Sequence, residues 1–413
     1  MSDTAPASGG KRASGEPERG GDARGGDAIV SLFYNPTFRG VLYQVALIAA
    51  ISFILYEAAT NAIVNMRRLG IVSGLSFWNA PAGFDINQRL IDYSSTYSTY
   101  GDAFWVGLLN TLLVAGMGIV LATLLGFIVG VARLSRNKII SLLASSYVEF
   151  FRNIPLLLQL YVWYNAVLRT LPAPRQSLTL ADAAYLNNRG LFLPQPVFGP
   201  GSEALLAAAA AAIAAIAFYR RWARRDQDIT GRQHATGTVS LLILLGALAA
   251  AWFLAGGPVT FNVPEQRGFN VAGGLQVFPE FVALLLGLSI YTAAFIAEIV
   301  RAGILSVSRG QTEAAYALGL RPGVSQRLII IPQAMRVIVP PLTSQLLNLT
   351  KNSSLAVAIG YPDLVQVFMG TVLNQTGQAI ECVVITMGVY LLLSLLTSFV
   401  MNIYNRRVAI VER

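Results

Sequence analysis

The sequence has little cysteine, histidine or charge. Of its 413 residues, one is cysteine, one is histidine and 12% are Asp, Glu, Lys or Arg. The lone cysteine, Cys382, excludes a disulfide within the chain, and the lone histidine, His234, excludes a histidine-based metal cluster. The low charge excludes an ordinary soluble globular protein, because such proteins carry about 25% charged residues.

Apolar residues make up 54% of the chain and fall in long runs, which is typical of a polytopic membrane protein. In a soluble protein the formal net charge of +9 would raise the question of nucleic acid. We expect no nucleic acid here, because loops that obey the positive-inside rule explain the charge better.

The N-terminal part combines a polar tail, an apolar stretch and a polar loop. Residues 1–38 lack the apolar core of a signal peptide and predict a disordered cytoplasmic tail. Residues 39–60 predict an additional spanning helix. Residues 61–102, with Trp78 and a run of Tyr, Ser and Thr, predict a periplasmic loop with aromatic anchors.

Residues 103–170 contain the longest uncharged run of the chain. Residues 103–132 carry no charge and several glycines, which predicts a spanning helix that packs closely on its neighbours. The apolar stretch that follows holds Glu149 and Arg152 at i, i+3 spacing, where they can pair on one helix face.

Residues 171–279 have the plain composition of an insertion. Two apolar stretches, at 204–219 and 237–256, predict a spanning hairpin flanked by periplasmic loops. Residues 280–405 predict further spans, and residues 328–350 contain three prolines. These prolines, with a lysine at 351, predict a broken helix lined by protein or water.

A short polar helix interrupts this second apolar part, in a loop at 306–332. Gly310 and Thr312 can open the helix, and Gly319 can end it in a left-handed conformation. Most of the 30 basic residues fall on the same side of the membrane as this loop, in a scheme with about eight spans. The predicted fold is therefore an all-α polytopic membrane protein with the loop, and a tail at 406–413, in the cytoplasm.

The loop also carries a recognisable spacing. Glu313-Ala314-Ala315, then Gly319, then Ile331-Pro332 resembles the EAA loop of permease subunits of binding-protein-dependent ABC importers. One position departs, since Ile331 stands where that pattern usually has Leu. The stretches 147–160, 291–301 and 348–355 look like the polar amino-acid branch of the family. The resemblance covers roughly 100–170 and 280–405, and it implies a five-helix core of the type I importer fold with additional helices around it.

The resemblance implies that the short helix couples this chain to an ABC ATPase dimer. The coupling residues would be Glu313, Ala314, Ala315, Leu318 and Gly319. The pattern Gly-x-x-x-x-Gly-Lys-Ser/Thr is absent from the sequence, so we expect a non-catalytic subunit without a cofactor of its own, with ATP and magnesium bound by the partner.

Further partners follow from the same resemblance. They are a periplasmic amino-acid-binding protein, the L-amino-acid substrate and a second permease subunit, for which a related chain is preferred and self-pairing is possible. The enlarged chain resembles a subunit of a general L-amino-acid importer, including the kind that favours Glu, Gln, Asp and Asn. We expect it in the bacterial inner membrane with both termini in the cytoplasm.

Several polar residues in the apolar segments are candidates for the substrate pathway: Glu298, Asn348, Lys351, Asn352, Ser353 and Asn153. A carboxylate inside a span is costly, so Glu298 must face the protein interior. It can contact a substrate ammonium or pair with Arg301 at i+3. Lys351, with its neighbours, can meet a substrate carboxylate or cap a helix break.

Two other classes of protein compete with the importer. A secondary transporter or channel driven by an ion gradient would predict internal repeats, and the sequence has no convincing repeat. An intramembrane enzyme would need a nucleophile beside a base, which the lone histidine and cysteine disfavour.

Overall fold

A computed structural model describes residues 36–68, 74–181 and 183–408 of the chain. Most of them are helical, as predicted, and within the described residues six helices are long and apolar enough to cross a membrane. The six are α2 (Pro36–Arg68), α3 (Tyr100–Ala132), α6 (Ser202–Thr230), α7 (Thr236–Leu254), α8 (Pro279–Leu305) and α13 (Ala379–Val408).

The chain divides into two units, and the first contains only α2 among the described residues. This helix is longer at both ends than the predicted span at 39–60. Apart from its last residues, the predicted tail at 1–38 lies outside the described residues, as does the tail at 406–413 beyond the end of α13.

The second unit is organised around the crossing of α3 and α8. Glycines on α3 let the two helices approach closely, as predicted for a packing role. A Cβ added at Gly126 would lie 2.6 Å from Cβ of Ile296, and one added at Gly130 would lie 2.7 Å from Cβ of Val300. No side chain larger than hydrogen therefore fits at these two positions without movement of α8.

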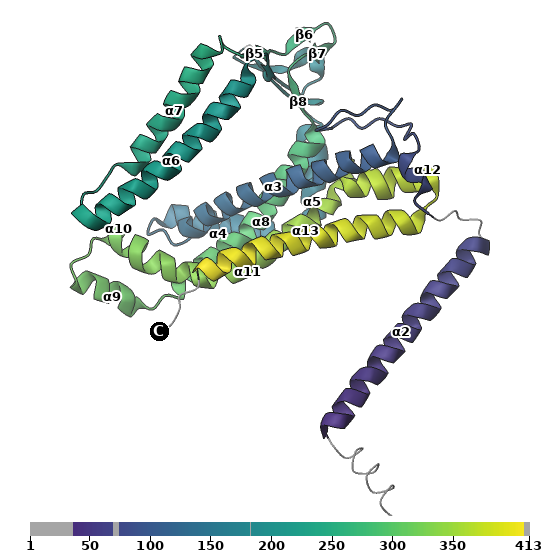
Figure 1. The fold of residues 1–413 in the computed structure, drawn as a ribbon, viewed down its shortest axis with the longest axis horizontal. Helices are drawn as coiled ribbons and strands as arrows, with labels where there is room; N and C mark the ends of the chain where they lie inside the picture. Colours follow the sequence, from purple (N-terminus) through teal and green to yellow (C-terminus); the bar gives the residue numbers. More distant parts are fainter. Residues whose placement is uncertain (1–35, 69–73, 182, 409–413) are drawn as a thin grey trace, which may run out of the picture. The chain divides into compact units, whose positions relative to one another are not determined.

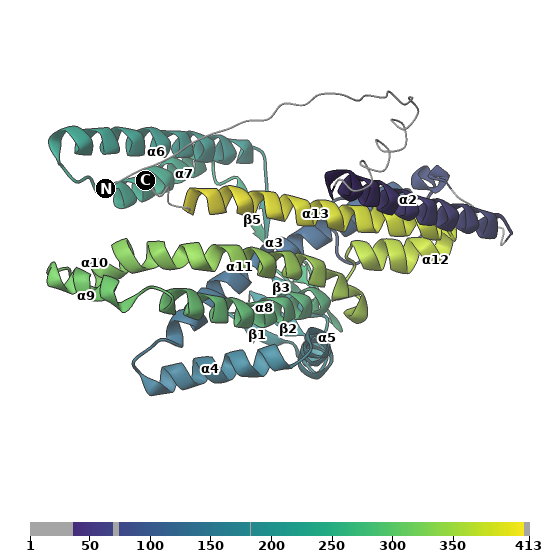
Figure 2. The same ribbon diagram turned by 90° about the horizontal axis from the view of Figure 1, so that it is seen from below.

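Further helices extend this pair into a bundle. Figure 2 shows α13, α11 (Ile331–Asn352), α8 and α4 (Lys138–Asn153) side by side in that order, in agreement with the contacts between them. Buried apolar side chains of α3, α8 and α11 form one of the core clusters, which includes Ile296, Val300 and Leu349.

Two of the predicted spans are not long apolar helices. The stretch after α3 is broken into α4, α5 (Leu156–Tyr161) and a π-helical segment, η2 (Val162–Leu168). The break falls at Ile154, which is extended because a residue before proline disfavours the helical region. The polar residues of α11 keep that helix out of the set of six.

The predicted break of the helix is absent at the prolines, but the α-helix does end at Asn352, where Lys351, Asn352 and Ser353 were expected to lie at a break. Pro340 and Pro341 both lie inside α11, which continues to Asn352. The helical path changes only afterwards, through a 3-10 segment, η5 (Ser353–Ile359), a π-helical segment, η6 (Val365–Val372), and α12 (Leu373–Thr376). These three elements were not predicted from the sequence.

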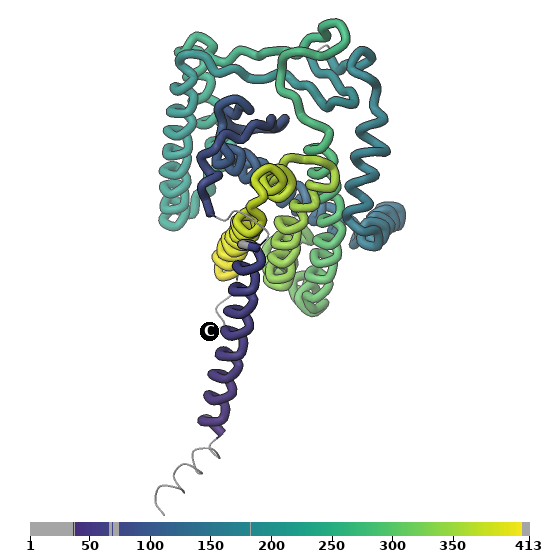
Figure 3. Tube along the Cα trace, turned by 90° about the vertical axis from the view of Figure 1, so that its right-hand side faces the viewer, coloured from purple at the N-terminus to yellow at the C-terminus, as the bar shows by residue number. Residues whose placement is uncertain are grey.

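The insertion forms the hairpin α6–α7 and eight short strands that were not predicted. The strands are β1 (Leu178–Leu180), β2 (Ala184–Asn187), β3 (Gly190–Leu193), β4 (Gln195–Phe198), β5 (Val259–Asn262), β6 (Glu265–Arg267), β7 (Asn270–Ala272) and β8 (Leu275–Val277). They pair antiparallel in the orders β1-β2-β3-β8, β4-β5 and β6-β7. The strands lie at one end of the helices, which we call the strand end (Figures 1 and 3).

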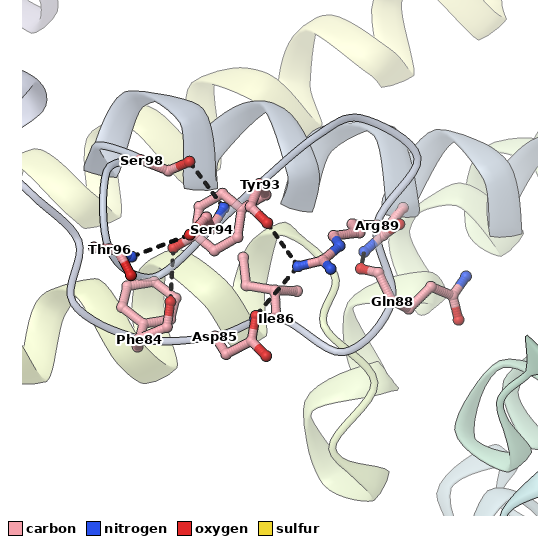
Figure 4. Close-up of polar contacts among 10 residues, drawn as sticks. Phe84, Asp85, Ile86, Gln88, Arg89, Tyr93, Ser94, Thr96 and Ser98 are labelled. Atoms are coloured by element: carbon pink, nitrogen blue, oxygen red, sulfur yellow. Dashed lines mark hydrogen bonds and ion pairs between the residues drawn. The ribbon is translucent and has the colours of Figure 1, made fainter. Parts of the chain in front are cut away.

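The loop before α3 also lies at the strand end and is well packed. It contains a short 3-10 helix, η1 (Ser76–Asn79), and a capping box formed by Thr99 and Asp102 starts α3. Arg89 donates to the carbonyl oxygen of Tyr93 at 2.6 Å (Figure 4). Burial, and then the Asp85 carboxylate, raises the pKa of Tyr93 to about 12, so its hydroxyl stays protonated and donates to the carbonyl of Phe84.

Candidate functional site

The short helix predicted in the loop is α9 (Arg309–Ala317), at the opposite end of α8 from the strands (Figure 1). Its N-cap is Ser308, so Gly310 and Thr312 both lie inside the helix and do not open it as predicted. The left-handed ending is confirmed, because Gly319 has a φ of +71°. The N–H of Leu320 donates to the carbonyl of Ala315 at 3.1 Å, which closes a Schellman motif.

One face of α9 packs on the chain and the other is free. Ala315 is buried, whereas Glu313, Ala314 and Gly319 are exposed. The side chain of Leu318, just after the helix, is 78% exposed. The residues predicted for coupling therefore lie together at the loop end of the bundle, which we define as the end that carries α9.

The exposed face continues onto the elements that follow α9. These are α10 (Pro322–Ser325) and the π-helical η4 (Gln326–Ile330), which leads into α11. A shallow hollow of about 560 Å³ lies there, lined by Arg321, Gly323, Val324, Arg327 and Leu328. A hydrogen bond of 3.3 Å between Gln311 and Gln333 ties α9 to α11.

Glu298 lies in a cluster with three arginines. Its carboxylate accepts hydrogen bonds from Arg133 and from Nη2 of Arg301, the latter at 2.7 Å, and Nη1 of Arg152 lies 3.8 Å away. Arg133 is the C-cap residue of α3. Glu298 lies about 10 Å along α8 from Leu305, the last residue of that helix. The cluster therefore joins α3, α4 and α8 towards the loop end. The predicted pairing with Arg301 is present, and a substrate role for Glu298 stays a prediction.

The predicted pair of Glu149 and Arg152 does not form among the described residues. The guanidinium of Arg152 instead lies 5.2 Å from the ring centre of Phe295 and beside Glu298. An i, i+3 pair on one helix contributes only about 0.2–0.5 kcal/mol, so contacts with a neighbouring helix outweigh it.

The other predicted pathway residues are divided between two helices. Asn348 and Lys351 are exposed on α11, in line with Ser344 at spacings that put all three on one face. Asn352 is half-buried, and Ser353 is buried and donates to the carbonyl of Thr350.

Asn153 lies at the end of α4, where it donates to the carbonyl of Glu149 at 2.8 Å. The structure does not bring Asn153 into contact with the row on α11 in the described part of the chain. The roles of all these residues in a pathway stay predictions.

Sequence reasoning missed a buried polar network at the strand end. The amide of Asn110 donates to the carbonyls of Gln88 and Pro362, and the hydroxyl of Tyr361 donates to the carbonyl of Asn110 at 3.1 Å. The carboxylate of Asp363, 1% exposed, accepts from Tyr390. The signal for this network in the sequence was Asn110, the lone Asn within the uncharged run that forms α3.

The helical bundle and its exposed loop helix define a membrane protein of the permease class. The family described as "Binding-protein-dependent transport system inner membrane component" matches residues 122–410, and the chain belongs to this family. The matched range contains α8, α9, α11 and α13.

Relatives of similar length agree with this assignment. The chain is 51% identical to the putative amino-acid ABC transporter permease protein YhdX of Escherichia coli, over 92% of this chain and 97% of that protein. It is 50% identical to the general L-amino acid transport system permease protein AapQ of Rhizobium johnstonii, over 93% and 95%. It is 42% identical to the glutamate/glutamine/aspartate/asparagine transport system permease protein BztB of Rhodobacter capsulatus, over 94% and 98%.

Proposed function

We propose that this chain is the transmembrane permease subunit of an ATP-driven importer that moves L-amino acids from the periplasm to the cytoplasm. Three relatives that match it over nearly their full length are named as amino-acid permeases, which supports this substrate class. Transport proceeds by alternating access, and ATP binding needs only to favour one of two conformations. The chain itself is non-catalytic.

The observation that carries the proposal is the exposed face of α9. An isolated helix of 9 residues is too short to be stable in water, so it needs a surface to pack on. Its small side chains and the exposed Leu318 suit insertion into a cleft of a cytoplasmic ATPase. That partner would bind ATP and magnesium, and Glu313, Ala314, Ala315, Leu318 and Gly319 would transmit its movement to α11.

A second permease would cover the polar row of Ser344, Asn348 and Lys351 on α11. Polar and charged groups that face lipid in a span are costly, so this row needs protein or water opposite it. The ammonium of Lys351 would suit the carboxylate of an amino acid. We prefer a related chain as the partner, and a periplasmic binding protein would deliver the substrate.

The arginines at the loop end support an inward orientation. Arg133, Arg220 and Arg301 follow or end three different spans on that side, as the positive-inside rule requires. We therefore place α9 and both termini in the cytoplasm, in the bacterial inner membrane.

The test is transport by the complex purified through this chain from its native membranes. We expect a P-loop ATPase and a second permease to copurify, and proteoliposomes to take up radiolabelled L-glutamate or L-glutamine only with internal ATP and added binding protein. Uptake that follows an ion gradient without ATP would contradict the proposal and favour a secondary transporter.

Two open glycines with a left-handed φ test the role of α9. Gly319→Asp puts a charged side chain at a left-handed residue, at a conformational cost of about 1–2 kcal/mol, and should lower ATP-dependent uptake at least tenfold. Gly231→Asp adds the same charge at another open glycine with a left-handed φ, in the connection between α6 and α7 and outside the α9 loop, and should leave uptake unchanged. Gly319→Asn tolerates the left-handed conformation and separates strain from charge. Equal uptake by the Gly319→Asp variant and the wild type would contradict a coupling role for α9, and the proposed function would lose the observation that carries it.

A further inference from the structure

The α6–α7 hairpin has a basic pocket at its turn, beside the loop end of the bundle. The pocket has a volume of about 300 Å³ and is lined by Arg220, Ala223, Arg224, Gln227, His234 and Thr236. Successive turns of α6 supply the first four of these residues, the connection between the helices supplies His234, and Thr236 is the first residue of α7. We propose that this pocket binds the phosphate of an anionic phospholipid.

The arginines of the pocket are free to bind an anion. The Nε of Arg220 donates to Oγ of Ser240 at 3.2 Å, which orients its guanidinium and leaves the terminal nitrogens open. The side chains of Arg224 and Gln227 have no hydrogen-bond or ion-pair partner in the described part of the chain. A guanidinium is the side chain best suited to a phosphate, which it can bind with two parallel N–H groups.

The acidic side chain beside the pocket, Asp226, is paired with His234 and not with a pocket arginine. Oδ2 of Asp226 lies 2.7 Å from Nε2 of His234, and the His234 ring packs on Trp222 with ring centres 5.0 Å apart. Neither pocket arginine has a carboxylate within 4.0 Å among the described residues. The first N–H groups of α7 point towards the same turn and have no side-chain cap, which adds partial positive charge.

The position of the pocket along α6 indicates a lipid and not a free anion. The 18 residues from Ser202 to Tyr219 carry α6 about 27 Å, close to the hydrocarbon thickness of about 30 Å. Arg220 and Arg224 therefore lie at the level of the headgroups. Tyr219 and Trp222 lie at the same level, where aromatic side chains favour the interface.

The hairpin also leaves room for lipid. Only 6% of the most apolar part of each of its helices is buried within the chain. Acyl chains attached to a phosphate in the pocket would therefore meet exposed apolar side chains of α6, among them Phe218 and Ile213. Basic pockets between spanning helices are a known type of site for acidic lipids.

Native mass spectrometry of the full-length chain in its complex, titrated with palmitoyl-oleoyl phosphatidylglycerol, tests the proposal. The pocket variant Arg220→Gln/Arg224→Gln is compared with Arg221→Gln/Arg225→Gln, which removes the same charge at the same spacing from positions outside the pocket. We expect the pocket variant to retain about tenfold less lipid than this control. Wild-type protein should retain far less palmitoyl-oleoyl phosphatidylcholine, and millimolar inorganic phosphate should not displace the anionic lipid.

Three results would overturn the proposal. Equal lipid loss in the two variants would mean a diffuse effect of charge. Displacement by inorganic phosphate would mean a site for a free anion. Loss of a protein partner at unchanged lipid retention would mean a protein contact. Arg220→Lys/Arg224→Lys keeps the charge and removes the planar guanidinium, so it should lower retention by a smaller factor and covers the case in which the Gln variant does not fold.

Discussion

Helices α7 and α8 are nearly equal in hydropathy and opposite in packing. Their most apolar windows have mean hydropathies of 2.1 and 2.0. Within the chain, 6% of that window is buried in α7 and 61% in α8. Hydropathy therefore predicts that both helices lie in the membrane, and it does not predict which of them belongs to the core of the bundle.

The surroundings of the glycines differ between α8 in the bundle and α7 in the hairpin. On α8, a Cβ added at Gly303 would lie 2.3 Å from Cγ1 of Ile338, whereas Gly237 and Gly246 on α7 have no atom near an added Cβ. In lipid there is little hydrophobic force between helices, so close contact between small residues and apolar side chains decides which helices associate. Gly303 on α8 has such a contact, whereas the glycines of α7 do not. Within the hairpin, α6 and α7 pack mainly on each other, through small residues such as Ala212 and Ala251.

The largest expected effect comes from filling the crossing of α3 and α8. Gly130→Val places atoms against Val300 and the carbonyl of Ala297, where an added Cβ already has contacts of 2.7 and 2.8 Å. Overpacking of this kind costs typically 1–3 kcal/mol, and two crowded groups on rigid helices favour the upper end. We expect a clear fall in the midpoint of thermal unfolding and in the yield of monodisperse protein.

Two matched glycines provide the controls for this substitution. Gly116→Val lies on the same helix in open space, and Gly246→Val lies on α7 in open space. Both should change the unfolding midpoint little, because valine is at least as good a helix former as glycine. Similar losses at all three positions would mean that the contrast between bundle and hairpin is not one of packing.

The next effect comes from the arginine cluster. Glu298→Gln removes the charge that holds Arg133, Arg152 and Arg301 together, so the three guanidinium groups repel one another. For a partly exposed cluster we expect a loss of about 1–3 kcal/mol in thermal or denaturant unfolding. Glu298→Gln combined with Arg133→Gln should recover part of it. Unchanged stability with altered uptake selectivity would instead favour contact with substrate.

Much of the fold follows from the sequence because the signals are local. Runs of uncharged residues are enough to locate α3, the hairpin and α8. The end of α9 could also be predicted, because Gly319 and the proline after it impose a left-handed turn whatever surrounds them.

The remainder depends on contacts between distant segments. Arg152 lies beside Glu298 and not Glu149 because α4 packs beside α8. The spacing of residues in the sequence does not reveal this packing. The strands were missed because each has only three or four residues, and two of the pairs, β3 with β8 and β4 with β5, join segments on either side of the hairpin. The roles predicted for residues on α9 and α11 concern partners and substrate, so a single chain leaves them as predictions.

A smaller effect is expected at the buried polar network. Tyr361→Phe removes the hydroxyl that donates to the Asn110 carbonyl at 3.1 Å and accepts from Nε2 of Gln88 at 3.2 Å. We expect a loss of about 1 kcal/mol in the free energy of unfolding, as for a typical buried hydrogen bond. Tyr97→Phe, at a side chain that is 73% exposed in the loop that holds Gln88, should have no effect. Equal effects would show that the network contributes nothing.

The smallest effect on the bundle should come from the largest change, removal of the hairpin. Strands β4 and β5 pair up to Phe198 opposite Val259, and the N–H of Gly199 donates to the carbonyl of Pro258 at 2.8 Å. Deletion of residues 202–256 would join these strands through a short connection, made of Gly199, Pro200, Gly201, Gly257 and Pro258. Loops of this length are common in β-hairpins, and glycines with positive φ suit them.

Because the deletion removes two spans, the side on which each remaining helix begins is unchanged. The free energy of unfolding of the bundle should therefore stay within about 0.5 kcal/mol of that of the intact chain, measured in the same detergent. Lipid retention should fall as in the Arg220→Gln/Arg224→Gln variant, since the pocket is gone. A bundle that no longer folds would mean that the hairpin stabilises it through contacts made in the assembled complex, and the division drawn between α7 and α8 would not hold.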